Sequence, residues 1–368
     1  MGKYADAFDR SISDREAFWL EAAQGVDWVT PPTRALDDSN APLYRWFPGG
    51  ELNTSVNALD RHVAAGRGDQ AALIWDSAMV GTVRTYTYSQ LLDEVSRFAG
   101  VLSAQGVTKG DRVIVYMPMI PEAAIAMLAC ARIGAVHSVV FGGFAAPELA
   151  TRIDDAQPVA LVTASGGIEP GRNIEYLPMA AKAIELSEFP PTTVIVKDRE
   201  QVAGSAADFD GWLDWDAEMA VAAPADAVTV AATDPLYVLY TSGTTGKPKG
   251  VVRDNGGHAV AMTWSMGNVY DIKAGDVFWA ASDVGWVVGH SYIVYAPLLS
   301  GATTVMYEGK PVGTPDAGAF WRVVADHKVS ALFTAPTAIR AIRKADPEAA
   351  ELAKYDVSTM HTLFAAGE

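Results

Sequence analysis

Short apolar runs recur along the chain and alternate with longer amphipathic stretches. The apolar runs predict strands at 71–75, 112–116, 135–140, 159–163, 236–239, 277–281, 302–306, 330–334 and 360–365, and 83–88 alternates like an edge strand. Helical spacing predicts helices at 89–106, with Ser89 as the N-cap, and at 121–134, 147–155, 257–269, 288–299, 316–327 and 336–344. Strands that recur with helices between them predict an α/β fold of mostly parallel sheets flanked by helices.

Two stretches break this alternation. Residues 1–57 are predicted to be a loop-rich extension whose scattered aromatic residues anchor it to a larger body. Residues 203–232 are rich in alanine and aspartate and are predicted to form a surface connection between two sheets. Because 368 residues exceed what one simple core holds, we expect an extension at 1–57, a first α/β subdomain at 58–230 and a second at 231–368.

The sequence 240–250, YTSGTTGKPKG, is the densest cluster of phosphate-binding chemistry in the chain. Its glycines let consecutive backbone amides converge on one point, while hydroxyls and lysines add donors and positive charge. Its spacing differs from a Walker A loop, because two residues separate the glycines and Pro248 stands where Ser or Thr is required. A polar surface turn is the alternative. We predict a loop for a triphosphate or pyrophosphate, with the candidate residues Thr241, Ser242, Gly243, Thr244, Thr245, Gly246 and Lys249.

Composition narrows the function classes. The net charge is −16, without a basic stripe, which argues against a nucleic-acid partner. The longest apolar patch, 123–141, is interrupted by Arg132 and His137, so no membrane span is expected. Cys130 is the single cysteine, so no internal disulfide is possible and we expect a reducing, cytoplasmic compartment. The histidines show no metal-ligand spacing, and His290 is interpreted as structural and not as a general base.

A series of motifs makes the chain resemble a known family. They are Asp60-Arg61-His62, Tyr116-Met117-Pro118-Met119, the segment 129–138, Phe141-Gly142-Gly143-Phe144, the loop 241–250, Asp283-Val284-Gly285-Trp286, Gly289-His290-Ser291-Tyr292 and Thr334-Ala335-Pro336-Thr337. Together they resemble the N-terminal part of the AMP-forming short-chain acyl-CoA synthetases over almost the whole chain. The segments 252–258 and 308–313 resemble the propionyl branch, with the acetyl enzymes as near relatives.

The resemblance implies a two-step reaction. A carboxylate, here propionate, attacks the α-phosphorus of ATP bound with Mg2+, and the thiol of coenzyme A then displaces AMP from the acyl-adenylate. The last predicted strand is followed by Gly367-Glu368 and no more, so we expect a fragment. The family's adenine motif, magnesium ligand and catalytic lysine would lie beyond residue 368, and we expect the chain alone to be inactive. The oligomeric state stays open.

The resemblance also implies site residues. Coenzyme A contacts are Phe141, Gly142, Gly143, Arg172 and Val288, the acyl pocket is Val287, Val288 and Ala366, and the adenylate contacts are Gly367 and Glu368. Without the resemblance, 141–143 would be a tight turn and Arg172 a solvated charge. Glu169 stands where acetate enzymes have a second arginine, so we expect this chain to bind the coenzyme A phosphates with a different set of residues.

Three alternatives stay open at this point. The chain could belong to an acetyl-CoA synthetase. Acetate enzymes carry valine where this chain has Ala366, and the smaller alanine favours propionate only because it leaves more room for the acid. It could be a short homologue that binds nucleotide or coenzyme A without catalysis. An aryl or long-chain acid ligase is disfavoured by the narrow pocket that Gly285-Trp286 and Ala366 suggest.

Overall fold

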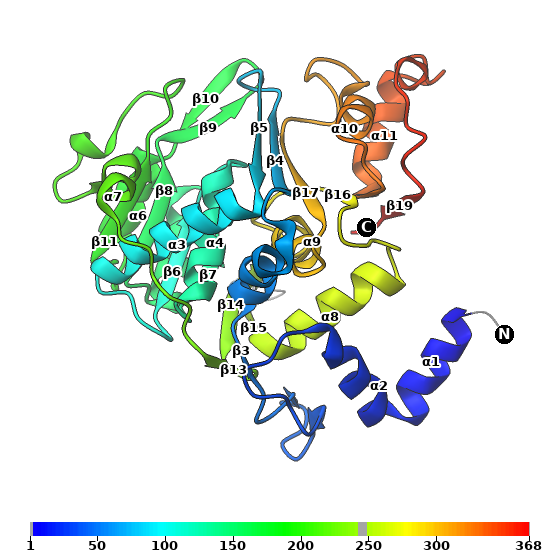
Figure 1. The fold of residues 1–368 in the computed structure, drawn as a ribbon. Coiled ribbons are helices and arrows are strands. Elements are labelled where there is room, and N and C mark those ends of the chain that lie inside the picture. The colour runs from blue at the N-terminus through cyan, green and yellow to red at the C-terminus, as the bar shows by residue number, and fades with distance from the viewer. Residues whose placement is uncertain (1–2, 242–248, 368) are drawn as a thin grey trace.

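The computed structural model describes residues 3–241 and 249–367. Two large sheets form its body (Figure 1). The seven-stranded sheet has the order β12 (Leu213–Asp214), β11 (Thr193–Lys197), β8 (Ala160–Ala164), β6 (Arg112–Tyr116), β7 (Val136–Val139), β14 (Pro235–Thr241) and β15 (Lys249–Asp254). All neighbours in it are parallel except β14 and β15, so the predicted α/β class with mostly parallel sheets is confirmed.

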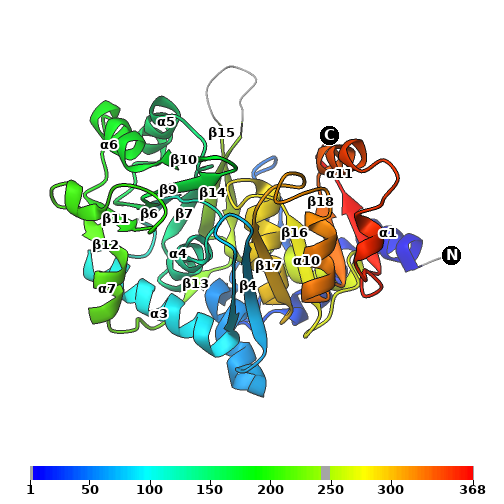
Figure 2. The same cartoon turned by 90° about the horizontal axis from the view of Figure 1, so that it is seen from above.

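The second sheet has six strands, several of which lie side by side in Figure 2. Their order is β19 (Thr362–Ala365), β18 (Ala331–Thr334), β16 (Val277–Ala281), β17 (Thr303–Glu308), β4 (Ala71–Ser77) and β5 (Thr82–Thr87). Only the pair β4–β5 is antiparallel, and β5 is at the edge, as its alternation predicts. Strand β4 thus pairs with β17, which lies beyond residue 230, and β5 joins the sheet through β4, while the proposed subdomain limits stay a prediction.

Helices form three layers around and between the sheets. The helices α3 (Tyr88–Ala104) and α4 (Pro121–Arg132) lie between the two sheets, where α3 contacts β4 and β5 and α4 contacts β6 and β7. On the outer face of the seven-stranded sheet are α5 (Ala146–Ala156) and α6 (Leu177–Leu186). The outer face of the six-stranded sheet packs against α10 (Ala319–His327) and α11 (Pro336–Ala345). The sheets are therefore covered on both faces.

This layering explains the continuous apolar runs. In β6, Val113 and Val115 face the core between the sheets, while Ile114 and Tyr116 face the outer core. A strand that is buried on both faces shows no alternation, which is typical of parallel sheets. Eleven of the twelve residues of α4 are buried, including Cys130, so the interpretation of that cysteine as a small buried hydrophobe is confirmed.

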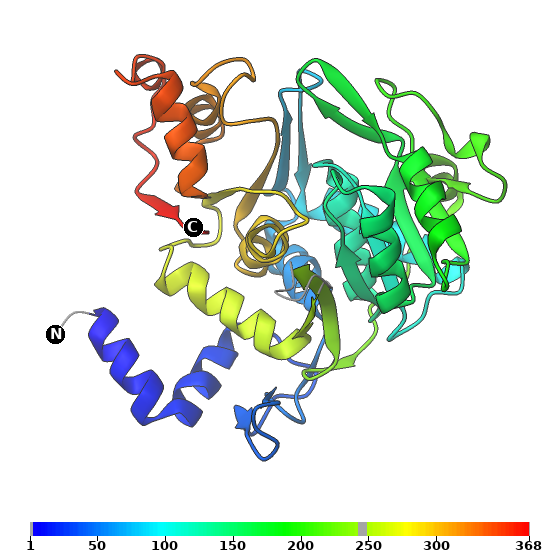
Figure 3. The same cartoon turned by 180° about the vertical axis from the view of Figure 1, so that it is seen from behind.

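The N-terminal prediction is wrong in part. Residues predicted to be loop-rich form α1 (Lys3–Ser13), α2 (Arg15–Ala22) and the 3-10 turn η1 (Ala23–Gly25), before the short strands β1 (Leu36–Asp37), β2 (Arg45–Trp46) and β3 (Glu51–Leu52). Good helix formers such as alanine, glutamate and arginine outweigh the scattered aromatics there. The aromatics do anchor the extension, because Trp19 packs against Trp46 and Trp264 at ring distances of 5.8 and 5.9 Å. Figures 1 and 3 show α1 projecting from the body.

Three further elements differ from the prediction. The N-cap of α3 is Thr87 and not Ser89, because Thr87 and Gln90 form a reciprocal capping box. The predicted connection 203–232 contains the 3-10 turn η4 (Ala206–Asp208), the edge strand β12, α7 (Trp215–Val221) and β13 (Val230–Ala231), and Trp215 stacks on Phe98 at 3.8 Å. A hairpin of β9 (Gly166–Glu169) and β10 (Arg172–Glu175) follows β8.

The remaining helical segments lie at several places along the chain. They are the π-helical turns η2 (Val56–Asp60) and η3 (Val63–Arg67), α8 (Asn255–Asn268), the π-helical η5 (Gly289–Tyr295) that continues into α9 (Ala296–Leu299), and the 3-10 turn η6 (Leu352–Lys354). The predicted helix 288–299 is thus π-helical over most of its length. In the parts of the chain that the structure describes, no helix has the length and apolarity that a membrane crossing requires.

Candidate functional site

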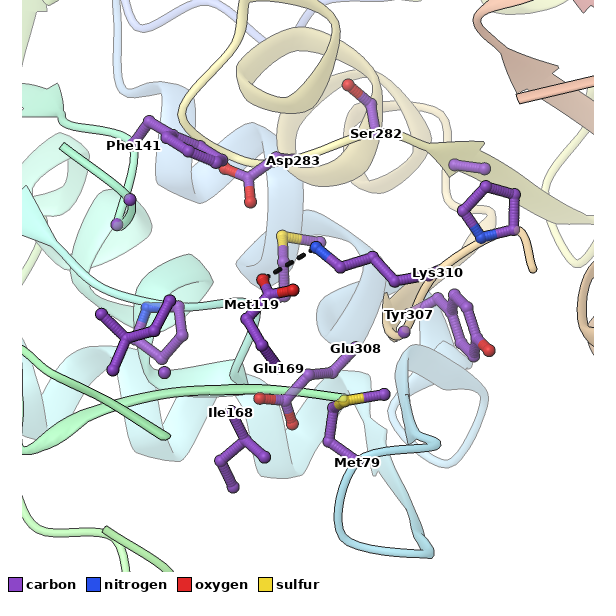
Figure 4. A pocket seen from close by; sticks show the side chains of 18 of the residues that line it. Met79, Met119, Phe141, Ile168, Glu169, Ser282, Asp283, Tyr307, Glu308 and Lys310 are labelled. Carbon is purple, nitrogen blue, oxygen red and sulfur yellow. Dashed lines mark hydrogen bonds and ion pairs between the residues drawn. The ribbon is translucent and has the colours of Figure 1, made fainter. Parts of the chain in front are cut away.

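A cavity of about 240 Å³ lies where strands from both sheets end (Figure 4). Met119 follows β6 and Phe141 follows β7 in the seven-stranded sheet, while Asp283 follows β16 and Lys310 follows β17 in the six-stranded sheet. These are the carboxyl ends of parallel strands, where ligands bind in open α/β sheets. The cavity is therefore the candidate active site.

One wall of the cavity is the segment 141–143. The ring of Phe141 lies 5.7 Å from the ring of Trp286 and keeps part of its surface exposed. A Cβ atom at Gly142 would come within 2.2 Å of the Tyr176 hydroxyl, and one at Gly143 within 2.5 Å of the Phe141 ring. Close packing alone therefore requires glycine at both positions, in addition to the ligand contact that the resemblance implies.

Asp283 lies beside Phe141 in the cavity wall (Figure 4). The backbone N–H of Gly285 donates to its Oδ1 at 2.8 Å, and burial raises the pKa of Asp283 to about 6. A Cβ atom at Gly289 would lie 1.9 Å from the Asp283 carbonyl oxygen, so the turn into η5 closes tightly under this residue. Burial therefore favours the neutral form of the Asp283 carboxyl group over its charged form.

An ion pair spans the cavity. Lys310 Nζ, in the loop after β17, lies 2.8 Å from Oε1 of Glu169 at the end of β9, and Figure 4 shows this contact across the cavity. Arg172 is the register partner of Glu169 in the β9–β10 hairpin and lines an adjoining cleft of about 990 Å³. Glu169 lines both the cavity and this cleft, so Lys310 and Arg172 lie in neighbouring hollows that share Glu169.

A second ion pair at the base of the cavity is buried. Arg199 donates to both oxygens of Glu308, at 2.8 and 3.1 Å, and the Ser77 hydroxyl donates to Glu308 at 2.7 Å. Arg199 follows β11 and Glu308 ends β17, so this pair joins the two halves of the molecule. Buried, bidentate pairs of this kind fix geometry.

The predicted phosphate loop lies mostly outside the described residues. Thr241 ends β14 and Lys249 begins β15, and the two are opposite each other in an antiparallel pair at the edge of the seven-stranded sheet (Figure 2). Ser242, Gly243, Thr244, Thr245 and Gly246 are not described. The phosphate-binding role of all seven residues stays a prediction.

Comparison with known proteins identifies the family. The model of the AMP-binding enzyme family matches residues 60–368, and a model described as the acetyl-coenzyme A synthetase N-terminus matches residues 4–58. The chain belongs to the AMP-binding enzyme family. The recognition of an acetyl-CoA synthetase-like chain is confirmed.

Individual relatives give the same family. The bovine protein named acyl-CoA synthetase short-chain family member 3, mitochondrial, is 54% identical over 100% of this chain and 54% of its own length. Propionate–CoA ligase of Escherichia coli is 47% identical over 99% of this chain and 58% of its own length. The solved acetoacetyl-CoA synthetase from Streptomyces lividans superposes with a TM-score of 0.90 at 30% identity, covering all of this chain and 55% of that one. The chain thus spans about half the length of the relatives it matches.

The residues that the family resemblance assigns to the acyl pocket lie elsewhere. Val287 is exposed and Val288 is partly buried against the core, both directly after Trp286. Ala366 is exposed after β19, with its N–H donating to the Thr334 carbonyl at 3.2 Å, Gly367 adopts a φ of 108°, and Glu368 is not described. Within the described residues, none of these lines the 240 Å³ cavity, and their roles stay predictions.

His290 is buried and bonds the backbone. Its Nδ1 donates to the Trp286 carbonyl at 3.0 Å, and burial lowers the pKa of His290 to about 4. The neutral ring therefore holds the turn that carries Trp286.

In the described part of this AMP-binding family member, no cluster of three or more His, Cys, Asp or Glu side chains is arranged to hold a metal ion.

Sequence reasoning missed two features of the site, the Lys310–Glu169 pair and the buried Arg199–Glu308 pair. Lys310 and Glu308 lie in the segment 308–313, which the sequence distinguishes only by its resemblance to one branch of the family. Their place at the end of a predicted parallel strand is the signal that could have selected them, because site residues gather at such ends. Their partners, Glu169 and Arg199, could not be predicted from the sequence, because they are far away along the chain and lie in a different part of the fold.

Proposed function

We propose that this chain carries the ATP- and coenzyme A-binding part of an AMP-forming acid–CoA ligase that acts on propionate. The complete reaction is proposed for a polypeptide that combines this chain with the half that its relatives possess in addition. Three findings support the proposal: family membership, a relative named propionate–CoA ligase, and the cavity between the sheets.

The single observation that carries the proposal is the convergence of four strand ends on one cavity that Lys310 lines, next to a cleft that Arg172 lines. Phe141 offers an aromatic face for an adenine ring, and Lys310 in the cavity and Arg172 in the adjoining cleft offer positive charge for phosphates. Lys310 would replace the second arginine of the acetate enzymes. A nucleotide with several phosphates, such as coenzyme A, matches this combination.

The first chemical step is assigned to the loop 241–249. Its amides, hydroxyls and Lys249 would hold the β- and γ-phosphates while the propionate oxygen attacks the α-phosphorus and pyrophosphate leaves. In the second step the coenzyme A thiol would lose its proton to solvent while its sulfur attacks the acyl carbon, and AMP would leave with the electron pair of the bond between the acyl carbon and the phosphate oxygen. Mg2+ enters this proposal as the ion bound to ATP, and no step is assigned to it.

Coenzyme A binding tests the proposed site directly. Calorimetry on the purified chain should show binding that Phe141→Ala weakens about tenfold, through loss of roughly 1–3 kcal/mol of stacking. Phe189→Ala is the matched control, because Phe189 is 47% exposed and does not line the cavity. Equal losses in both variants, or no binding by the unaltered chain, would overturn the assignment.

Acid preference needs a second experiment. The native polypeptide, purified from its source with an antibody against this chain, would be assayed for ATP–pyrophosphate exchange with acetate, propionate and butyrate. Propionate should stimulate exchange most, since alanine at 366 leaves room for a further methylene worth about 0.8 kcal/mol. Preference for acetate would favour an acetyl-CoA synthetase. Coenzyme A binding without exchange for any acid would favour a non-catalytic homologue.

A further inference from the structure

Asp283 is a titratable side chain of the candidate active site to which the proposed reaction assigns no role. It lies beside Phe141 in the wall of the cavity and is partly exposed there (Figure 4). The two residues meet around Gly285, since a Cβ atom at Gly285 would lie 2.8 Å from Phe141 Cα and 3.1 Å from Asp283 Oδ1. A flat group that stacks on the Phe141 ring inside the cavity would therefore have an edge near the Asp283 carboxyl group.

The two oxygens of this carboxyl group are not equivalent. Oδ1 accepts the backbone N–H of Gly285 at 2.8 Å, whereas none of the residues that the structure describes donates a hydrogen bond to Oδ2. An oxygen that already accepts an N–H is the poorer place for a proton. The protonated group therefore has a carbonyl acceptor at Oδ1 and an O–H donor at Oδ2.

The charges around Asp283 are largely compensated by one another. The other titratable groups that line the cavity are Glu169, Tyr176, Tyr307, Glu308 and Lys310. Lys310 pairs with Glu169, and their effects on the pKa of Asp283 oppose each other. Glu308 pairs with Arg199, and burial raises the pKa of both tyrosines, so their hydroxyls stay protonated. Burial is thus the largest cause that raises the pKa of Asp283 to about 6.

The protonated carboxyl group matches one edge of an adenine ring. Adenine presents an acceptor, N1, next to a donor, its exocyclic amine N6, and a carboxylic acid presents an O–H donor next to a carbonyl acceptor. A charged carboxylate has acceptors only, so one of its oxygens would face the lone pair of N1. Loss of the proton therefore replaces a hydrogen bond by a repulsion.

We propose that the protonated Asp283 carboxyl group recognises the adenine of coenzyme A, donating from Oδ2 to N1 and accepting from N6 at Oδ1, while the ring stacks on Phe141. This inference rests on the proposed function, because it takes coenzyme A as the ligand of the cavity. Asp283 is then a specificity-determining residue. Wherever it is charged in the free protein, coenzyme A binding takes up one proton from the buffer, and that proton stays on Oδ2.

Isothermal titration of coenzyme A into the chain between pH 6 and pH 8 tests the proposal. Asp283→Asn has the same size, donor and acceptor as the protonated acid but needs no proton, so it should bind about tenfold more tightly than the unaltered chain at pH 8 and within about twofold of it at pH 6. Titrations in buffers of different ionisation enthalpy should show uptake of about half a proton at pH 7 by the unaltered chain, and less by Asp283→Asn. The second ionisation of the coenzyme A phosphate, near pH 6, affects both proteins alike, so the difference between them isolates Asp283.

A coenzyme A analogue with hypoxanthine in place of adenine tests the contact itself. Hypoxanthine has a donor at N1 and an acceptor at position 6, the reverse of adenine, while Gly285 fixes the orientation of the side chain at 283. Asp283→Asn should therefore bind the analogue about tenfold more weakly than coenzyme A, whereas Asp283→Ala should bind the two ligands alike. Asp93→Asn is the matched control for the loss of one charge, because Asp93 forms an exposed pair with Arg97 on α3 and should behave like the unaltered chain.

Two results would overturn this inference alone. If binding depended on Phe141 but Asp283→Asn kept the pH dependence of the unaltered chain, Asp283 would not share a proton with the ligand. If Asp283→Ala kept the preference for adenine over hypoxanthine, another group would recognise the base. No coenzyme A binding at all, or binding that Phe141→Ala leaves unchanged, would overturn both the inference and the proposed site.

Discussion

The Lys310–Glu169 pair gives a prediction in which two substitutions act in opposite directions. In the free protein Lys310 Nζ lies 2.8 Å from Glu169 Oε1. If Lys310 binds a phosphate of coenzyme A, as proposed, that phosphate competes with Glu169 for the ammonium group. Lys310→Gln should then weaken coenzyme A binding, while Glu169→Gln should strengthen it.

The exposure of the two side chains sets the magnitude. They are 47% and 32% exposed, so their pair contributes no more than about 1 kcal/mol to stability and opens at small cost. A charge-assisted hydrogen bond to phosphate contributes about 1.5–3 kcal/mol. The net loss for Lys310→Gln is therefore roughly 1–2 kcal/mol, which corresponds to about tenfold weaker binding. Removing the competing carboxylate should tighten binding by about two- to fivefold.

Isothermal titration of coenzyme A into the chain at low and high salt measures both effects, and the double variant completes a thermodynamic cycle. Lys182→Gln is the matched control, because Lys182 forms an exposed pair with Glu185 on α6. The two effects should shrink at high salt. If Lys310→Gln and Glu169→Gln weakened binding equally, the pair would be a structural clamp. If neither changed binding, Lys310 would not contact the ligand.

Three further predictions concern stability. Glu308→Gln should lower the free energy of unfolding by about 3–5 kcal/mol in urea denaturation, since it leaves the buried Arg199 guanidinium uncompensated; a loss below about 1 kcal/mol would contradict this. Burial raises the pKa of Asp283 to about 6, so the folded chain holds this proton more tightly than the unfolded chain and stability falls as pH rises from about 4 to 6. Asp283→Asn should flatten that part of the pH profile, and an unchanged profile would refute the reasoning. Gly142→Ala should lower stability by about 1–3 kcal/mol through its clash with the Tyr176 hydroxyl, and Tyr176→Phe should recover part of the loss in a melting experiment.

Much of the fold could be predicted because the two sheets are covered on both faces. The strand predicted at 277–281 has the observed limits of β16, and the one at 112–116 those of β6. Such strands need no partner to be recognised, since burial on both sides makes them uniformly apolar. The β9–β10 hairpin could not be found in this way, because Gly166, Gly167 and Glu169 show neither an apolar run nor alternation.

The site could be predicted only as far as the family resemblance reaches. The resemblance selected Phe141, Gly142 and Gly143, which follow β7 at the carboxyl end of a parallel strand, and their role in binding stays a prediction. Which residues then meet across the cavity depends on how two separate sheets sit against each other. No local pattern around Glu169 or Lys310 encodes that distance, and so a contact across 141 positions of sequence stayed hidden.

The two ion pairs at the cavity show how burial separates a fixed contact from an exchangeable one. Both join the six-stranded sheet to the other half of the molecule, and both contain a carboxylate and a cation about 2.8 Å apart. The Arg199–Glu308 pair has side chains that are 6% exposed, so opening it would leave two buried charges unpaired, at a cost that ligand binding does not recover. The Lys310–Glu169 pair faces solvent and opens at little cost. A phosphate that enters the cavity can therefore displace Glu169 from Lys310 while Arg199 and Glu308 keep the two halves in place.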